Sequence, residues 1–117
     1  MARIFYVHWH EAEAKTHVGA LASEGHKVDC HWSTEAPPKI REPYPDALVI
    51  SLDRLPSHGR HVAEWFWEAK KRRSHPVVFV GGKEDKVAAA RAQFPDAVSC
   101  SRDELPLALG RLLQAKR

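Results

Sequence analysis

The sequence has few of the features that mark a secreted, membrane or disulfide-stabilised protein. Only two of the 117 residues are cysteine, Cys30 and Cys100, so no disulfide framework is expected. No apolar run approaches the roughly 20 residues that span a bilayer, and the first residues enter a strand pattern without a secretory signal. We therefore expect a cytoplasmic protein without membrane contact.

Neither sign of charge dominates the chain. The net charge is +3, and much of the excess lies in Lys70-Lys71-Arg72-Arg73 and at residues 116–117. Such a cluster can bind a polyanion, but basic residues at a helix end also complement the helix dipole, which is the interpretation we favour. No nucleic-acid-binding motif accompanies the cluster, so a nucleic-acid partner is not expected.

The apolar pattern predicts one α/β domain with five strands. Strands are predicted at 3–9, 27–32, 47–52, 76–80 and 97–100, and helices at 12–24, 60–73, 84–93 and 104–114. The proline-rich segment 33–45 predicts a loop with a short helix or none. Right-handed crossovers then give a doubly wound parallel sheet in the order 2-1-3-4-5. In that order Cys30 and Cys100 lie on opposite edges, too far apart for a disulfide.

Candidate functional residues follow the third and fourth strands. Ligands collect at the carboxyl ends of the strands in an open α/β sheet, and Asp53 stands there, three residues before Pro56. Gly81 and Gly82 predict a tight turn into the next helix, and backbone N–H groups at that turn are alternatively anion donors. We predict Asp103 as the cap of the last helix, because this places Pro106 in the first turn.

The layout, together with the third strand and its continuation Leu55-Pro56-Ser57-His58-Gly59, resembles the receiver domain of two-component response regulators. The resemblance implies a flavodoxin-like fold, an acidic pair after strand one that binds Mg²⁺, and a phospho-acceptor aspartate four residues before the proline. It also implies a Thr or Ser after strand four and a Lys-Pro pair before the last helix. The corresponding positions here are His8-Trp9-His10, Leu52 with Asp53 one residue later, Gly81-Gly82, and Cys100-Ser101-Arg102.

These departures predict a degenerate receiver. Mg²⁺ needs several hard oxygen ligands, which Asp53 alone does not supply, so Mg²⁺ is not expected. We therefore expect a stand-alone, non-enzymatic signalling module that acts through an unidentified protein partner. The alternative that Asp53 still accepts a phosphoryl group despite its shifted position stays open.

Histidines suggest a second kind of function. His8, His10, His31 and His58 follow neighbouring strands, and with Glu11 or Asp53 they offer ligands for Zn²⁺ or a similar metal. This would make the chain a small metal- or ligand-binding protein, including an enzyme; the competing interpretation is a set of polar side chains lining loops. We expect the other histidines (His17, His26, His61 and His75) at surface or cap positions.

The predicted helix over 60–73 carries Trp65-Phe66-Trp67. Three consecutive residues span about 200° of a helix surface, so at least one tryptophan should be partly exposed. Exposed tryptophan is typical of binding surfaces, and Trp65 and Trp67 are therefore the candidate interaction residues. The receiver resemblance implies a second surface, formed by the last two helices and the last strand, through which a homodimer would form.

Overall fold

The computed structural model describes residues 2–33, 38–54 and 56–115. Five strands form one parallel sheet: β1 (Arg3–Val7), β2 (Lys27–His31), β3 (Ala47–Ser51), β4 (Val77–Val80) and β5 (Val98–Cys100). The helices are α1 (Glu11–Ser23), α2 (Pro56–Glu68), α3 (Glu84–Gln93) and α4 (Leu105–Ala115), with a 3-10 turn η1 (Lys70–Arg72) after α2. The sheet order is β2-β1-β3-β4-β5, which confirms the predicted topology.

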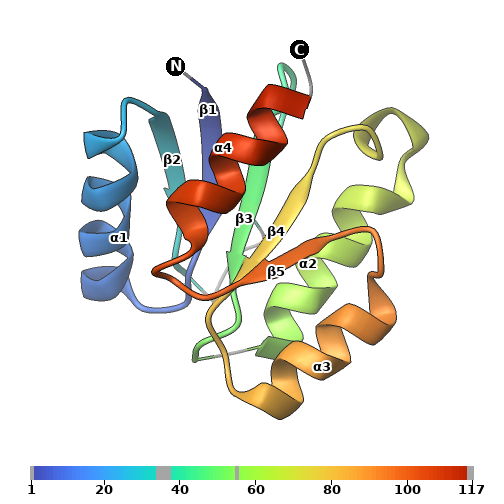
Figure 1. The fold of residues 1–117 in the computed structure, drawn as a ribbon. Helices are drawn as coiled ribbons and strands as arrows, with labels where there is room; N and C mark the ends of the chain where they lie inside the picture. Colours follow the sequence, from blue (N-terminus) through green and yellow to red (C-terminus); the bar gives the residue numbers. More distant parts are fainter. Residues whose placement is uncertain (1, 34–37, 55, 116–117) are drawn as a thin grey trace.

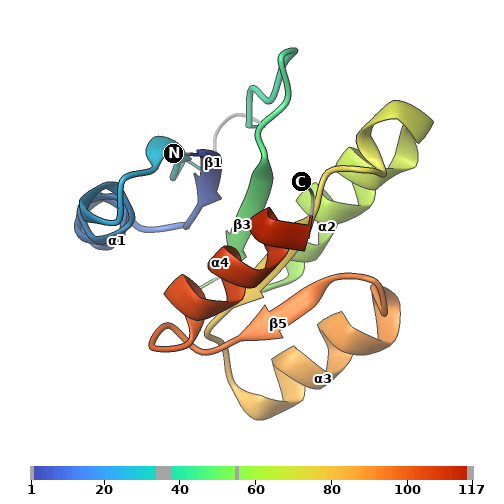
Figure 2. The ribbon, with the colours of Figure 1, turned by 45° about the horizontal axis from the view of Figure 1, so that its top comes forward.

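Two helices cover each face of the sheet. α1 and α4 lie on one face, and α2 and α3 lie on the other (Figures 1 and 2). All strands run in the same direction, so the loops that lead into the four helices meet at one edge of the sheet. Within the described part of the chain, no helix is long and apolar enough to cross a membrane.

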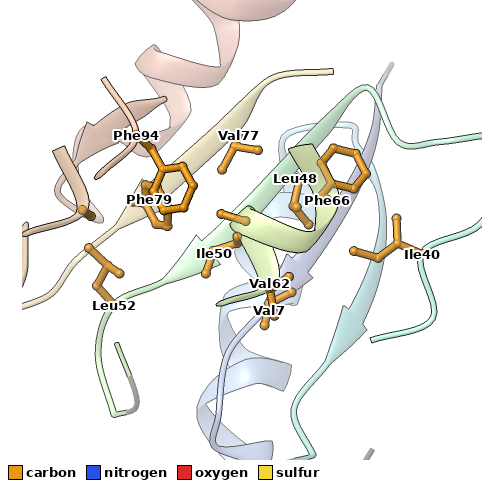
Figure 3. Packing of buried hydrophobic residues seen from close by; sticks show 12 residues of the cluster. Val7, Ile40, Leu48, Ile50, Leu52, Val62, Phe66, Val77, Phe79 and Phe94 are labelled. Atoms are coloured by element: carbon orange, nitrogen blue, oxygen red, sulfur yellow. The ribbon is translucent and has the colours of Figure 1, made fainter. Parts of the chain in front are cut away.

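A separate apolar core fills the space on each side of the sheet. Under α2 and α3, Leu48, Ile50 and Phe79 of the central strands meet Phe66 and Phe94 (Figure 3). The other face of the same strands packs under α1 and α4, with Ile4, Tyr6, Val49, Val78, Leu21, Leu105 and Leu109. The strands are thus buried on both faces, which is why they read as unbroken apolar runs.

Three boundaries differ from the prediction by two residues or more. The helix predicted to end at residue 73 ends at Glu68, because the chain continues as the 3-10 turn η1. The other two differ for local reasons. β1 ends at Val7 rather than at residue 9, because His10 caps α1 and its Nδ1 accepts a hydrogen bond from the N–H of Glu13 at 3.3 Å. α2 begins at Pro56 rather than at residue 60, since proline fits the first turn of a helix. Segment 38–46 contains no helix; residues 34–37 of the predicted loop lie outside the described residues. Cys30 and Cys100 lie on opposite edge strands, as predicted.

The basic run after α2 stabilises the end of that helix. Arg72 donates from Nε to the carbonyl oxygen of Phe66 at 2.7 Å and from Nη2 to that of Trp65 at 3.0 Å. Arg73 donates from Nε to the carbonyl oxygen of Trp67 at 2.8 Å. These carbonyls are the unpaired acceptors at a helix C-terminus, so the two arginines have the structural role that the helix-dipole interpretation favoured.

Gly59→Ala should destabilise the fold, because α2 lies close to β3 at this residue. A Cβ here would lie 2.8 Å from Cγ2 of Ile50 and 3.2 Å from the carbonyl oxygen of Ser51. We expect the free energy of unfolding, measured by urea denaturation, to fall by about 1–3 kcal/mol. Gly19→Ala is the matched control: nothing lies within 4 Å of its Cβ position in α1, and alanine should add about 0.5–1 kcal/mol. A loss of equal size in both variants would contradict the close packing of α2 on β3.

Candidate functional site

Asp53 lies just beyond β3, at the edge where the helix-leading loops meet. Its backbone N–H donates to Oγ of Ser51 at 3.1 Å. Its Oδ1 accepts a hydrogen bond from the N–H of Gly82 at 2.9 Å, and its Oδ2 accepts one from Nη2 of Arg102 at 2.9 Å. Although partial burial opposes ionisation, the Gly82 amide and the Arg102 guanidinium hold the pKa of Asp53 below its usual value. The chain itself therefore engages both oxygens of this carboxylate.

The Gly81-Gly82 turn brings its backbone against Asp53 and Leu52. Both glycines have positive φ angles, 72° and 90°. A Cβ on Gly81 would lie 2.6 Å from Oδ2 of Asp53, and one on Gly82 would lie 2.6 Å from Cβ of Leu52. Only glycine satisfies both the close approach and the backbone conformation. The turn thus uses one amide to bind an anionic group, the chain's own carboxylate.

Arg102 reaches the site from the turn between β5 and α4. Here Oγ of Ser101 accepts a hydrogen bond from the N–H of Glu104 at 3.2 Å, and Oε1 of Glu104 accepts one from the N–H of Ser101 at 3.0 Å. This is the reciprocal pair of a capping box. The prediction that Asp103 caps the helix is wrong: the pair forms a separate turn, and α4 begins only at Leu105.

The Arg102 guanidinium joins this turn to two central strands. Nη1 donates to the Tyr6 hydroxyl at 2.8 Å, and Nη2 lies 3.0 Å from Oγ of Ser51 and 3.4 Å from Nδ1 of His8. With Asp53, this guanidinium has four acceptors from β1, β3 and the residues that follow them. The side chains of Arg102 and Asp53 are 29% and 39% exposed, so solvent screens their charges only in part.

Tyr6, His8 and the half-buried His17 form a polar cluster behind Arg102. Tyr6 and His8 are 0% and 1% exposed. Because Arg102 only donates, the Tyr6 hydroxyl accepts from it and donates to Nδ1 of His17 at 2.8 Å. By the same logic Nδ1 of His8 accepts from Arg102, and Nε2 donates to Oε1 of Glu13 at 2.8 Å. This arrangement needs an unprotonated Nδ1 on each imidazole, and the lowered pKa values of His8 and His17 favour the same neutral form.

Burial governs the titration of this cluster. It lowers the pKa of His8 and His17 and raises the pKa of Tyr6 to about 12. His17 was expected at a surface or cap position, but it is half-buried and bonds to the Tyr6 hydroxyl. Its position three residues after Ala14 and four before Leu21 places it on the buried face of α1. This helical spacing is the sequence signal that could have placed His17 on the packed face of α1.

A cavity of about 550 Å³ opens beside these groups. Its lining has four cationic side chains (Arg54, Lys83, Lys86 and Arg102) and two carboxylates (Glu13 and Asp53), together with His17, Leu52 and Gly82. Arg54 donates from Nε to Oε1 of Glu13 at 3.1 Å and from Nη2 to Oε2. The hydrogen bonds from Arg54, and then from His8, lower the pKa of Glu13 to about 2.

The lining does not fit Mg²⁺, the ion that the receiver resemblance implies. Mg²⁺ demands near-octahedral oxygen coordination, whereas each of the two carboxylates in the cavity is already paired with an arginine. An entering dication would also lie close to both guanidinium charges, which repel it.

The histidines do not form the predicted metal site. His8 packs on Tyr6 and bonds to Glu13, and His10 caps α1. His31 and His58 instead lie against the ring of Trp9, at centroid distances of 5.8 and 5.5 Å. Among the described residues, no group of three or more His, Cys, Asp or Glu side chains is placed to hold a metal ion. The prediction fails because β1 ends at Val7, so His8 and His10 do not share a strand face.

Trp65 and Trp67 of α2 are held differently. Trp67 is half-buried: its Nε1 donates to the carbonyl oxygen of His75 at 2.9 Å, and its ring contacts Phe94. Trp65 is 41% exposed, with the Arg72 guanidinium 4.4 Å from its ring centroid. The expected exposed tryptophan is therefore chiefly Trp65. Two exposed apolar side chains were not predicted, Trp32 and Leu107.

The free energy of unfolding should fall in acid, because the folded state keeps His8 and His17 neutral. Both pKa values are lowered from the usual 6.5, so below that pH the unfolded chain binds more protons than the folded one. We expect the free energy of unfolding, measured by urea denaturation, to fall as the pH drops below roughly 6.5, with a slope of at most about 1.4 kcal/mol per pH unit for each histidine. The lowered carboxyl pKa values of Asp53 and Glu13 act only at more acidic pH.

Two variants test whether His17 contributes to this pH dependence. His17→Gln should remove part of the slope, whereas His61→Gln, at an exposed position of α2, should leave it unchanged. An unaltered slope in His17→Gln would show that this imidazole is not held neutral.

Comparison with known proteins identifies the fold. No family model and no curated protein sequence matches the chain. The receiver domain of the Francisella response regulator 1452 has a TM-score of 0.77 at 13% identity, over 100% of both chains. The response regulator TrrA of Thermotoga maritima, in complex with Mg²⁺-BeF, has a TM-score of 0.74 at 19% identity, over 96% of this chain and 99% of TrrA. NtrX of Brucella abortus has a TM-score of 0.72 at 21% identity over 97% of this chain, which spans only 27% of NtrX. The chain therefore has the fold of response-regulator receiver domains.

Proposed function

We propose that this chain is a degenerate receiver: a signalling module that acts by contact with a protein partner, without enzymatic activity and without metal-dependent phosphorylation. The observation that carries the proposal is the engagement of Asp53 by Arg102 and Gly82, each at 2.9 Å. The carboxylate that would accept a phosphoryl group is already bound on both oxygens by groups of the chain itself.

The position of Asp53 supports the same conclusion. The receiver resemblance places the acceptor four residues before the proline, where this chain has Leu52, which is 2% exposed and apolar. Phosphoryl transfer also relies on cations that bridge the phosphate oxygens, usually Mg²⁺. The cavity lining has carboxylates that are paired with arginines in place of free oxygen ligands.

Two exposed apolar side chains mark the faces through which a partner would bind. Trp65 stands on α2 with Arg72 stacked on it, and tryptophan and arginine are enriched in the residues that dominate binding energy. Leu107 is 60% exposed on α4, and α4 belongs to the face that the receiver resemblance implies for a homodimer. We place the protein-binding surface at Trp65 and a homodimer contact at Leu107.

Incubation with acetyl phosphate and Mg²⁺ should leave the protein unmodified. The reason is that Asp53 is paired with Arg102 and the cavity does not fit the metal. The measurement is intact mass spectrometry, followed by borohydride trapping and peptide mapping. A receiver domain that is phosphorylated under the same conditions serves as the control. A phosphoryl adduct on Asp53 would overturn the proposed function and make the chain a working receiver.

Trp65→Ala and Trp67→Ala should differ in their effect on stability. Trp67 has a hydrogen-bonded indole and packs on the core, so its loss should lower the free energy of unfolding by about 2–4 kcal/mol. Trp65 is exposed, and its loss should cost less than about 1 kcal/mol. Urea denaturation of both variants gives the comparison. If Trp65→Ala is as destabilising as Trp67→Ala, then Trp65 belongs to the fold and is not available for binding.

A further inference from the structure

The cavity beside Asp53 carries positive charge that the fold does not use. Arg54 is paired with Glu13, and Arg102 is paired with Asp53. The side chain of Lys83 makes no hydrogen bond or ion pair in the described parts of the chain, although its carbonyl oxygen accepts from the N–H groups of Lys86 and Val87. Nζ of Lys86 lies 3.8 Å from Oδ2 of its neighbour Asp85, which is a long contact for an ion pair. Two lysine charges on the cavity wall therefore have no carboxylate in the lining left to balance them.

Lys83 is an unfavourable residue at the N-terminus of α3. It is the N-cap of α3, and its side chain makes no capping hydrogen bond. Helices favour a side-chain acceptor at the N-cap and negative charge near the N-terminus, and lysine supplies neither. Glu84 and Asp85 supply negative charge in the first turn of the helix, but they are exposed and do not line the cavity.

The cavity walls come from separate parts of the chain. Glu13 and His17 belong to α1, Arg54 follows β3, Lys83 and Lys86 begin α3, and Arg102 follows β5. A ligand here would contact all of these segments at once. The volume of about 550 Å³ is more than a phosphate ion fills, and it lies within the usual range of small-molecule sites.

We propose that this cavity binds the phosphate group of a small phosphorylated molecule, reversibly and without metal, through Lys83, Lys86 and the Arg102 side of the cavity. A phosphate dianion matches the two unbalanced lysine charges, and the remaining volume holds the organic part of the ligand. No covalent bond forms. The inference rests on the proposed function in one respect, that Asp53 stays paired with Arg102 and is not itself phosphorylated.

The test is a titration of the ¹⁵N-labelled full chain, with EDTA present, by inorganic phosphate and separately by phenyl phosphate. We expect saturable amide shifts at Gly82, Lys83 and Lys86 with phenyl phosphate, with or without a weaker response to inorganic phosphate. The double variant Lys83→Gln/Lys86→Gln should bind about tenfold more weakly or worse, because each charged hydrogen bond is lost. Both side chains are exposed, so the variant should keep its fold.

Lys27→Gln/Lys70→Gln is the matched control, because it removes the same charge at exposed positions outside the cavity. It should bind like the wild type. Shifts that do not saturate with either probe would overturn the inference, as would equal weakening in the two double variants. No phosphoryl donor is present in this titration. Its failure is therefore distinct from a phosphoryl adduct on Asp53, which tests the proposed function.

Discussion

The arrangement at the C-terminal edge of the sheet depends on one buried hydrogen-bonding requirement. Tyr6 lies on β1 and His8 follows that strand, and both polar side chains are almost fully buried. Burying such groups is costly unless they are hydrogen-bonded, and the donor that serves both is the Arg102 guanidinium. Arg102 is itself a partly buried cation, so it needs the carboxylate of Asp53. The pairing of Asp53 is thus part of how the core is completed.

This requirement explains why the edge of the sheet carries a different charge from the one that the receiver resemblance implies. A metal-binding receiver gathers carboxylates there, and their repulsion is relieved by Mg²⁺. Here guanidinium groups relieve it: Arg54 neutralises Glu13, and Arg102 neutralises Asp53. The two arginines thus supply the positive charge that a dication would otherwise provide. With Lys83 and Lys86, the cavity lining holds four cationic side chains against two carboxylates, a balance that favours anions over cations.

The fold was predictable from the sequence because buried parallel strands leave a strong local signal. Apolar runs such as Ala47–Ser51 and Val77–Val80 need no distant information to be recognised. The candidate site was predictable only in part. Asp53 and the glycine turn follow strands directly, whereas Arg102 is separated from Asp53 by 49 residues and is aimed by a turn that was misassigned. The prediction of a histidine metal site was wrong for a related reason. β1 ends at Val7, two residues earlier than predicted, and this changes which side chains share a face.

The same geometry indicates how a change at the cavity would reach the rest of the molecule. The loops that line it lead into α2, α3 and α4, and α1 contributes Glu13 and His17 directly. Arg54 precedes α2, which carries Trp65, and Arg102 precedes α4, which carries Leu107. A ligand or a proton that alters the Arg102 pairing therefore acts where the helices begin, and two of these helices carry the exposed side chains of Trp65 and Leu107. Because the strands are packed on both faces, we expect such a change to move helix starts and loops and to leave the sheet in place.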